Sequence, residues 1–210
     1  MKSGRRQAYS MVARADAMAA SRDRIAHAML QLALEQAYED ITLAAIAQAA
    51  DVSHQTVLNH FDSKEGVAAA AAELLAQQTG EARAKARSGD VKGAIGVLVG
   101  EYERIGDANV RWAMSSERLG SLAPLLDKAR AGHQAWLERV FSDSLPTAPA
   151  ARRRAIHALH VSTDVYTWKL LRRDLKLSRT EVETIMVDLV SGILNAGSAA
   201  RRSRSARGAR

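Results

Sequence analysis

Apolar residues recur at helical spacing along most of the chain, and no stretch shows the alternation that is typical of a β-strand. Ile25, Met29 and Leu32 share one face of a helix that is expected to begin after Ser21 and to end near Gln36. Polar residues then interrupt the pattern, which indicates shorter elements. Three further small helices are expected over the ranges 43–50, 54–60 and 64–78, with Thr42 and Ser63 as N-caps.

Beyond a polar segment at residues 80–89 the helical pattern resumes in longer stretches. Ser178 and Glu181 have the spacing of a capping box at the start of the last stretch. Five longer helices are expected over 91–105, 109–119, 122–144, 150–173 and 178–199. The pattern therefore predicts an all-α protein of about nine helices. Its expected parts are a flexible basic arm (1–20), a small domain (21–80), a larger domain (81–200) and a disordered basic tail (201–210).

The composition supports this picture and excludes several classes of protein. Hydrophobic residues make up 47% of the chain, aromatic residues only 4%, and three prolines leave room for long helices. The absence of cysteine excludes thiolate catalysis, Cys-ligated zinc and disulfides. The chain contains no run of 18 apolar residues, so no membrane span is expected. Arg14 and Asp16 interrupt the apolar segment that a secretory signal would need. We therefore expect a cytoplasmic protein with no membrane partner.

The formal net charge of +7 is concentrated at the two ends of the chain. Residues 1–14 hold four basic and no acidic residues, and residues 201–210 hold five arginines and no acidic residue. The rest of the chain holds 21 basic and 23 acidic residues. Such ends are expected to be disordered alone and to reach phosphates without sequence preference. The alternative is that they serve only solubility.

The segment DVSHQTVLNHF, residues 51–61, completes the spacing of a helix-turn-helix. Ala47 is small where two helices must cross, Asp51 tolerates the left-handed turn between them, and Val57 is the branched residue that packs inward. Ser53 is expected to cap the second helix, whose N-terminus can enter the major groove of DNA.

Residues 25–75 resemble the DNA-binding domain of TetR-type (TetR/AcrR) transcriptional regulators. The matching positions are Thr42, Ile46-Ala47-Gln-Ala-Ala50, Val52-Ser53, Thr56, His60-Phe61 and Ser63-Lys64-Glu65. The resemblance implies a homodimer that binds a palindromic operator in double-stranded DNA and is released by a small ligand.

The resemblance also implies roles for individual residues. It places Thr42, His60 and Lys64 at phosphates. On the recognition helix it places Ser53, His54, Gln55, Thr56 and Asn59. Leu58 stands where the family usually has Tyr, and a leucine can contact a thymine methyl group.

The small domain lacks the positive charge that DNA binding needs. Residues 21–80 contain three basic and eight acidic residues. We therefore expect Arg5, Arg6 and Arg14 of the N-terminal arm to supply the attraction to phosphate.

The larger domain contains all three tryptophans and is expected to enclose an apolar ligand pocket with a few polar groups. The predicted lining residues are Tyr102, Trp112, Met114, His133, Trp136, His160, Thr163 and Asp164. The alternative is that the aromatic residues form the core and that His160 and Asp164 only hold their helix in place.

Apolar stripes on the last two predicted helices suggest a four-helix dimer interface. The candidate interface residues are Ile156, Val165, Trp168, Val182, Ile185, Met186, Leu189 and Ile193. The alternative is that one protomer buries both stripes.

No sequence feature indicates catalysis, a cofactor or a metal. His157 and His160 lack a third ligand at metal-site spacing, and nucleophile-elbow and phosphate-loop motifs are missing. The predicted function is therefore non-enzymatic: a sequence-specific DNA-binding regulator, interpreted as a repressor released by a small apolar or amphipathic ligand. One alternative is a DNA-binding regulator or architectural protein with no effector. Another is a helical binding protein or enzyme that uses the helix-turn-helix as scaffold.

Overall fold

The computed structural model describes the backbone of residues 2–208 and the side chains of residues 15–196. Across that part of the chain every regular element is a helix and none is a strand, which confirms the predicted fold class. The elements are α1 (Lys2–Glu35), η1 (Tyr38–Asp40), α2 (Leu43–Ala49), α3 (His54–Phe61), α4 (Lys64–Ala84), α5 (Val91–Leu119), α6 (Ala123–Phe141), η2 (Ser142–Ser144), α7 (Pro149–Thr163), α8 (Val165–Lys169), η3 (Leu170–Asp174) and α9 (Arg179–Gly208).

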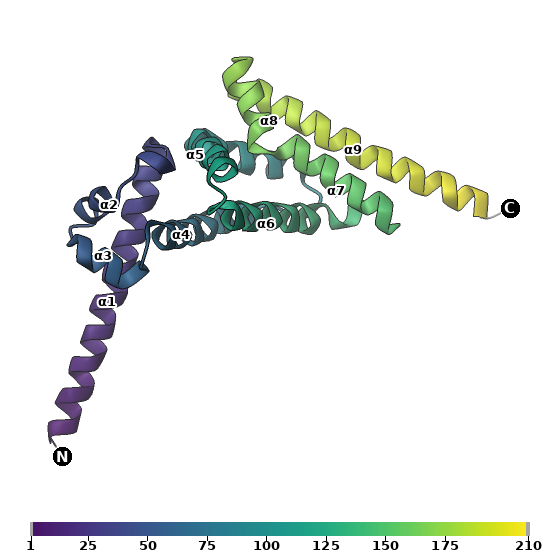
Figure 1. Ribbon diagram of the computed structural model, residues 1–210. Coiled ribbons are helices and arrows are strands. Elements are labelled where there is room, and N and C mark those ends of the chain that lie inside the picture. The colour runs from purple at the N-terminus through teal and green to yellow at the C-terminus, as the bar shows by residue number, and fades with distance from the viewer. Residues whose placement is uncertain (1, 209–210) are drawn as a thin grey trace.

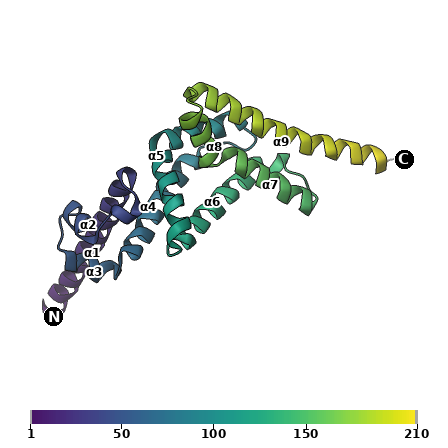
Figure 2. The same cartoon turned by 45° about the horizontal axis from the view of Figure 1, so that its top comes forward.

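The helices form two groups joined by α4 (Figure 1). Helices α1 to α4 gather at one end of the molecule, and α5 to α9 form the other, larger end. The first part of α1 extends beyond α2 and α3, and the last part of α9 extends beyond α7, in both views (Figures 1 and 2). The boundary predicted near residue 80 falls inside α4, which runs on to Ala84 without a break.

The helix-turn-helix region forms because side-chain caps start each of its short helices. The hydroxyl oxygens of Thr42, Ser53 and Ser63 accept hydrogen bonds from main-chain N–H groups three residues later, at 3.1, 3.0 and 3.2 Å. Asp51 has φ of 53°, so it adopts the left-handed turn conformation that was predicted for it. These three caps and this turn residue fix where α2, α3 and α4 begin.

Gly66 lets α4 approach the C-terminal end of α3 closely. A Cβ atom at this position would lie 2.2 Å from the main-chain oxygen of Phe61, which is far inside contact distance. The corner between α3 and α4 therefore has no room for a side chain at residue 66.

Several predicted helix boundaries are wrong. The first helix begins at Lys2 instead of after Ser21, because residues 5–20 contain neither glycine nor proline and continue it; the arm expected to be flexible has a helical backbone. Helix α9 likewise continues into the tail, as far as Gly208. Eight helices have seven residues or more in the described part of the chain, where the sequence predicts about nine.

Two further differences concern the larger domain. Helix α5 is continuous through residues 106–108, where a break was expected. The single helix expected over 150–173 is interrupted at Asp164, whose backbone is extended and whose carboxylate accepts a hydrogen bond from the N–H of Tyr166 at 2.9 Å. The carboxylate thus starts a new short helix, α8, which continues into the π-helical turn η3.

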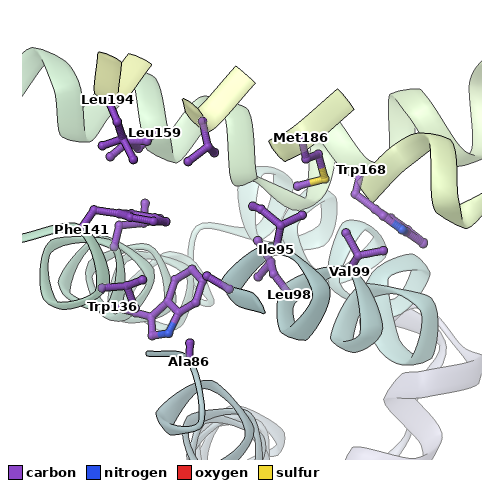
Figure 3. Packing of buried hydrophobic residues seen from close by; sticks show 14 of the residues in the cluster. Ala86, Ile95, Leu98, Val99, Trp136, Phe141, Leu159, Trp168, Met186 and Leu194 are labelled. Atoms are coloured by element: carbon purple, nitrogen blue, oxygen red, sulfur yellow. The ribbon is translucent and has the colours of Figure 1, made fainter. Parts of the chain in front are cut away.

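Two apolar clusters hold the fold together. One lies among α1 to α4 and includes Leu122 from the start of α6; the other lies among α5, α6, α7 and α9 (Figure 3). The second cluster contains four of the residues predicted for the dimer interface: Ile156, Trp168, Val182 and Met186. These four predictions are wrong, because the side chains are buried within one protomer and are unavailable to a partner.

Candidate DNA-binding surface and ligand cavity

The recognition helix α3 turns its polar side chains outward. Val57 and Phe61 are buried beneath it, as predicted. Its N-cap Ser53 and the side chains of His54, Gln55 and Asn59 are exposed, whereas those of Thr56, Leu58 and His60 are half-buried. Thr42, at the start of α2, is also exposed.

Four of these outward-facing side chains form hydrogen bonds in pairs. The hydroxyls of Ser53 and Thr56 lie 2.8 Å apart, and the Gln55 amide nitrogen donates to the Asn59 amide oxygen at 3.0 Å. Each amide group keeps further donor or acceptor capacity after this bond. The pairs therefore preset the side-chain orientations and leave hydrogen-bonding atoms open on the outer face.

Two arginines of α1 for which the sequence pattern predicts no role reach the C-terminal ends of α2 and α3. Arg22 donates to the main-chain oxygen of His60 at 2.7 Å, and its guanidinium lies 4.2 Å from the centre of the Phe61 ring. Arg24 donates to the main-chain oxygen of Ala50 at 3.4 Å. Both side chains are exposed, so they bring positive charge beside the recognition helix. The side chains of Arg5, Arg6 and Arg14 lie outside the described residues.

Lys64 is held at the start of α4 by the segment that follows α1. Its ammonium donates to the main-chain oxygens of Tyr38 and Ile41 at 2.9 and 2.8 Å, and it lies 4.1 Å from the centre of the Tyr38 ring. The Tyr38 hydroxyl donates to the carboxylate of the next residue, Glu65, at 3.0 Å. Burial, with Glu65 adding to it, raises the pKa of Tyr38 well above its usual value. An ammonium has three donors, and main-chain oxygens use two of those of Lys64.

A cavity of about 660 Å³ lies between the two groups of helices. Its wall includes Leu30 and Leu34 of α1, much of α4, and residues of α5, α6 and the α7–α8 corner. Six of the eight predicted lining residues face it: Tyr102, Trp112, His133, Trp136, His160 and Asp164.

The other two predicted lining residues lie elsewhere. Met114 is 54% exposed and borders a separate hollow, because it lies on the outer side of α5. Thr163 is fully buried behind the wall, where its hydroxyl bonds to His133 at 2.8 Å.

A buried ion pair that no local sequence pattern predicts connects α4 to α5 at the cavity. Arg83 donates twice to the carboxylate of Glu101, at 2.8 and 2.7 Å, and Glu101 is only 5% exposed. Burial would lower the pKa of Arg83, but the hydrogen bonds and charge of Glu101 raise it. The main-chain oxygen of Arg83 accepts from Trp136 at 3.1 Å and from Arg139 at 3.0 Å, so α6 also holds the last turn of α4.

His133 extends this network from α6 to α7. Arg83 lies 3.3 Å from its Nδ1, so Nδ1 accepts, and the proton on Nε2 is donated to the hydroxyl of Thr163. Thr163 in turn donates to the main-chain oxygen of Leu159 at 2.7 Å. Burial and the positive charge of Arg83 lower the pKa of His133 to about 3, so the ring is neutral at physiological pH.

His160 and Asp164 form an ion-pair contact of 3.3 Å at the wall, as the sequence suggested. Burial would raise the pKa of Asp164, but the hydrogen bonds from His160 and from the N–H of Tyr166 lower it. Two buried nitrogens of the wall residues have no hydrogen-bond partner: Nδ1 of His160 and Nε1 of Trp112. Among the described residues, no group of three or more metal-binding side chains is present.

The larger domain also forms direct hydrogen bonds to the segment after α1. Glu39 accepts hydrogen bonds from Ser115 at 2.7 Å and from Arg118, both on α5. The bond from Ser115 is the main reason why the pKa of Glu39 is lowered. The Trp112 ring meets the Tyr38 ring edge-on, with centroids 5.5 Å apart. The cavity wall and the residue that holds Lys64 are therefore neighbours.

None of the described helices is both long enough and apolar enough to cross a membrane.

Comparison with known proteins identifies both the domain and the fold. Residues 25–71 match the family described as bacterial regulatory proteins, tetR family. A tetR-family transcriptional regulator from Streptomyces coelicolor superimposes with a TM-score of 0.73 at 17% identity, over 89% of this chain and 85% of its own. A comparison with curated proteins finds no match.

Two more solved structures have the same fold. A transcriptional regulator from Rhodococcus sp. Rha1 has a TM-score of 0.63 at 20% identity, over 83% of this chain and 96% of its own. The multidrug binding protein EbrR, crystallised with imidazole, has a TM-score of 0.58 at 16% identity, over 80% of this chain and 93% of its own.

Proposed function

We propose that this chain, whose residues 25–71 match the tetR family of bacterial regulatory proteins, is a repressor released from a palindromic operator by a small ligand. The observation that carries the proposal is the position of the cavity. Its wall is made by α1 and α4, which hold the recognition helix, together with α5, α6 and the α7–α8 corner. A molecule in the cavity contacts both parts of the protein at once.

Base reading and phosphate binding are divided between different residues in this proposal. The exposed side chains of Ser53, His54, Gln55 and Asn59 read base edges, with Thr56 and Leu58 beside them. Thr42, His60 and Lys64 hold phosphates, together with Arg5, Arg6 and Arg14 of the N-terminal part of α1. Arg22 and Arg24 join this second group, because they lie at the ends of α3 and α2 and are exposed.

Release requires that ligand binding changes the position of the recognition helices. In a dimer they must lie about 34–36 Å apart to enter successive major grooves. Two connections support such coupling: α4 runs from the cavity to the recognition helix, and Trp112 of the wall touches Tyr38, which holds Lys64. A ligand that binds the released state more tightly shifts the equilibrium by its difference in affinity.

The proposed homodimer uses the outer faces of α7 and α9. The apolar side chains of Val161 and Leu189 are 68% and 44% exposed on these helices. Ile185, Ile193 and Val165 are half-buried against the core, so they contribute only their outer edges. Leu189→Glu is expected to give a monomer by light scattering with an unchanged circular-dichroism spectrum. A dimer of unchanged affinity would place the interface elsewhere.

Selection of bound DNA from a random pool tests the DNA-binding part. We expect a palindrome, and we expect operator fluorescence anisotropy to fall when an effector is added. Recovery of no preferred sequence would favour the alternative of an architectural protein.

Deletion of residues 1–14 tests the source of positive charge. We expect weaker operator binding and a shallower dependence of log Kd on log salt concentration, since fewer counterions are released. An unchanged salt slope would remove the arm from the proposal and leave Arg22, Arg24 and Lys64 as the phosphate contacts.

A further inference from the structure

Every charged side chain that lines the described cavity already has a partner within the protein. Arg83 and Glu101 neutralise each other in the interior, and Asp164 is paired with His160. At the mouth, Lys128 contacts Glu73 at 3.0 Å, Arg130 contacts Glu117 at 3.7 Å, and the exposed Arg139 donates to a main-chain oxygen. Each buried charged group of the wall is therefore already hydrogen-bonded within the protein.

This arrangement disfavours a charged ligand. A buried carboxylate or ammonium needs an opposite charge close by, because desolvation of an unpaired ion costs several kcal/mol. A charged ligand group would have to break the bidentate Arg83–Glu101 pair or the His160–Asp164 contact to obtain one.

The cavity wall offers uncharged hydrogen-bonding atoms instead. The N–H of Trp112 is a buried donor with no partner. Nδ1 of His160 is a second buried nitrogen with no partner, while Nε2 of the same ring lies 3.3 Å from the Asp164 carboxylate. Each unsatisfied group leaves a desolvation cost that a ligand hydrogen bond can recover.

The remainder of the wall is mostly apolar, and it also contains a second tryptophan that can serve as a control for Trp112. It includes Leu30, Leu34, Ala72, Leu75, Ile105 and Leu125. A second tryptophan of the wall, Trp136, differs from Trp112 in one respect, because its N–H already donates to the main-chain oxygen of Arg83.

We infer that the cavity takes a largely apolar ligand that is uncharged and that accepts a hydrogen bond from Trp112. The inference rests on the proposed function, since it names the chemical class of the effector. Alcohols, phenols and primary or secondary amides meet both requirements, whereas carboxylates and quaternary or primary ammonium ions do not.

A set of pyrene derivatives tests the inference directly in the full chain, because they share one apolar ring and report binding by fluorescence. We expect 1-pyrenemethanol to bind about tenfold or more tightly than pyrene, 1-pyrenecarboxylate and 1-pyrenemethylammonium, a difference of one good hydrogen bond or of one unpaired charge.

Two matched variants assign the effect to the predicted atom. Trp112→Phe removes the free N–H and keeps an aromatic ring, so most of the preference for the alcohol over pyrene should disappear. Trp136→Phe removes an N–H that is already bonded, so the preference should persist. Circular dichroism and melting temperature show whether each variant is folded.

Three results would overturn the inference. They are tighter binding of the carboxylate or the ammonium compound, a preference for the alcohol that survives Trp112→Phe, and no binding of any member of the set. None of them bears on operator selection, dimerisation or release by another molecule, so failure of this inference is distinguishable from failure of the proposed function.

Discussion

Beside the recognition helix, basic side chains donate to main-chain oxygens, whereas at the cavity Arg83 is buried against a carboxylate. Arg22, Arg24 and Lys64 donate to oxygens at the ends of α3, at the end of α2 and in the segment after α1. Arg83 is instead bonded twice to Glu101 in the interior. The first arrangement leaves positive charge facing outward, and the second leaves none.

The difference shows how one chain can present two electrostatically different surfaces. A main-chain oxygen carries only a partial charge, so an arginine or lysine bonded to it still attracts phosphate. A carboxylate cancels the charge of an arginine, so the buried Arg83–Glu101 pair adds no net charge to the cavity wall. The same residue types are therefore consistent with the proposed DNA surface in one region and with the proposed uncharged ligand in the other.

Breaking the buried pair should have the largest effect. Arg83→Ala leaves the Glu101 carboxylate buried without a partner, and we expect the free energy of unfolding to fall by about 3–5 kcal/mol in urea denaturation. The double variant Arg83→Met with Glu101→Leu should recover much of this loss. A single variant that loses less than about 1 kcal/mol would show that the pair is not the main support of the α4–α5 contact.

The corner beside the recognition helix can be broken without changing any charge. Gly66→Ala forces a Cβ atom against the main-chain oxygen of Phe61, and we expect a loss of about 1–3 kcal/mol together with weaker operator binding. Gly80→Ala, in the same helix with nothing within 4 Å, should raise stability by about 0.5–1 kcal/mol. Equal effects of the two substitutions would contradict the packing argument.

Acid should weaken the cavity network before it affects the carboxylates. The pKa of His133 is lowered to about 3 in the folded protein, so the unfolded chain binds the proton first as pH falls below about 6.5. The free energy of unfolding therefore falls as the pH falls, by about 1.5 kcal/mol between pH 6.5 and pH 5. His133→Gln should remove this part of the pH dependence in denaturation curves, and an identical slope in both proteins would exclude His133 as its source.

The smallest effect is expected at the mouth of the cavity. Lys128 and Glu73 form an ion pair between α6 and α4 in which both side chains are about two-thirds exposed. We expect Lys128→Ala to change the free energy of unfolding by less than about 0.5 kcal/mol, because water screens the pair. A loss of stability as large as that of Arg83→Ala would mean that exposure to solvent does not explain the different strengths of the two ion pairs.

The small domain was the more predictable region because its signals are local. The caps at Thr42, Ser53 and Ser63 and the turn at Asp51 each depend on neighbours within a few residues, and the structure confirms all four. The capping box of Ser178 and Glu181 is confirmed for the same reason, with bonds of 2.8 and 3.3 Å.

The cavity was less predictable because its contacts join distant parts of the chain. The residue types that line it were largely anticipated, yet the pairing of Arg83 with Glu101 depends on how α4 meets α5. The apolar stripes on the last helices show the same limit. Periodicity places Val182 and Met186 on one face of α9, but it does not reveal whether that face meets α5 and α7 or a second protomer.

The close approach of Trp168 to Gly106 has a consequence for how this protein tolerates mutation. A Cβ atom at residue 106 would lie 2.5 Å from the indole ring, whereas Gly96 and Gly192 have nothing within 4 Å. In a library of random variants selected only for folding, we expect residue 106 to stay glycine and the other two to accept alanine. Because residue 106 lines neither the recognition surface nor the cavity, a glycine retained there across diverging sequences would record the demands of folding and carry no information about operator or effector.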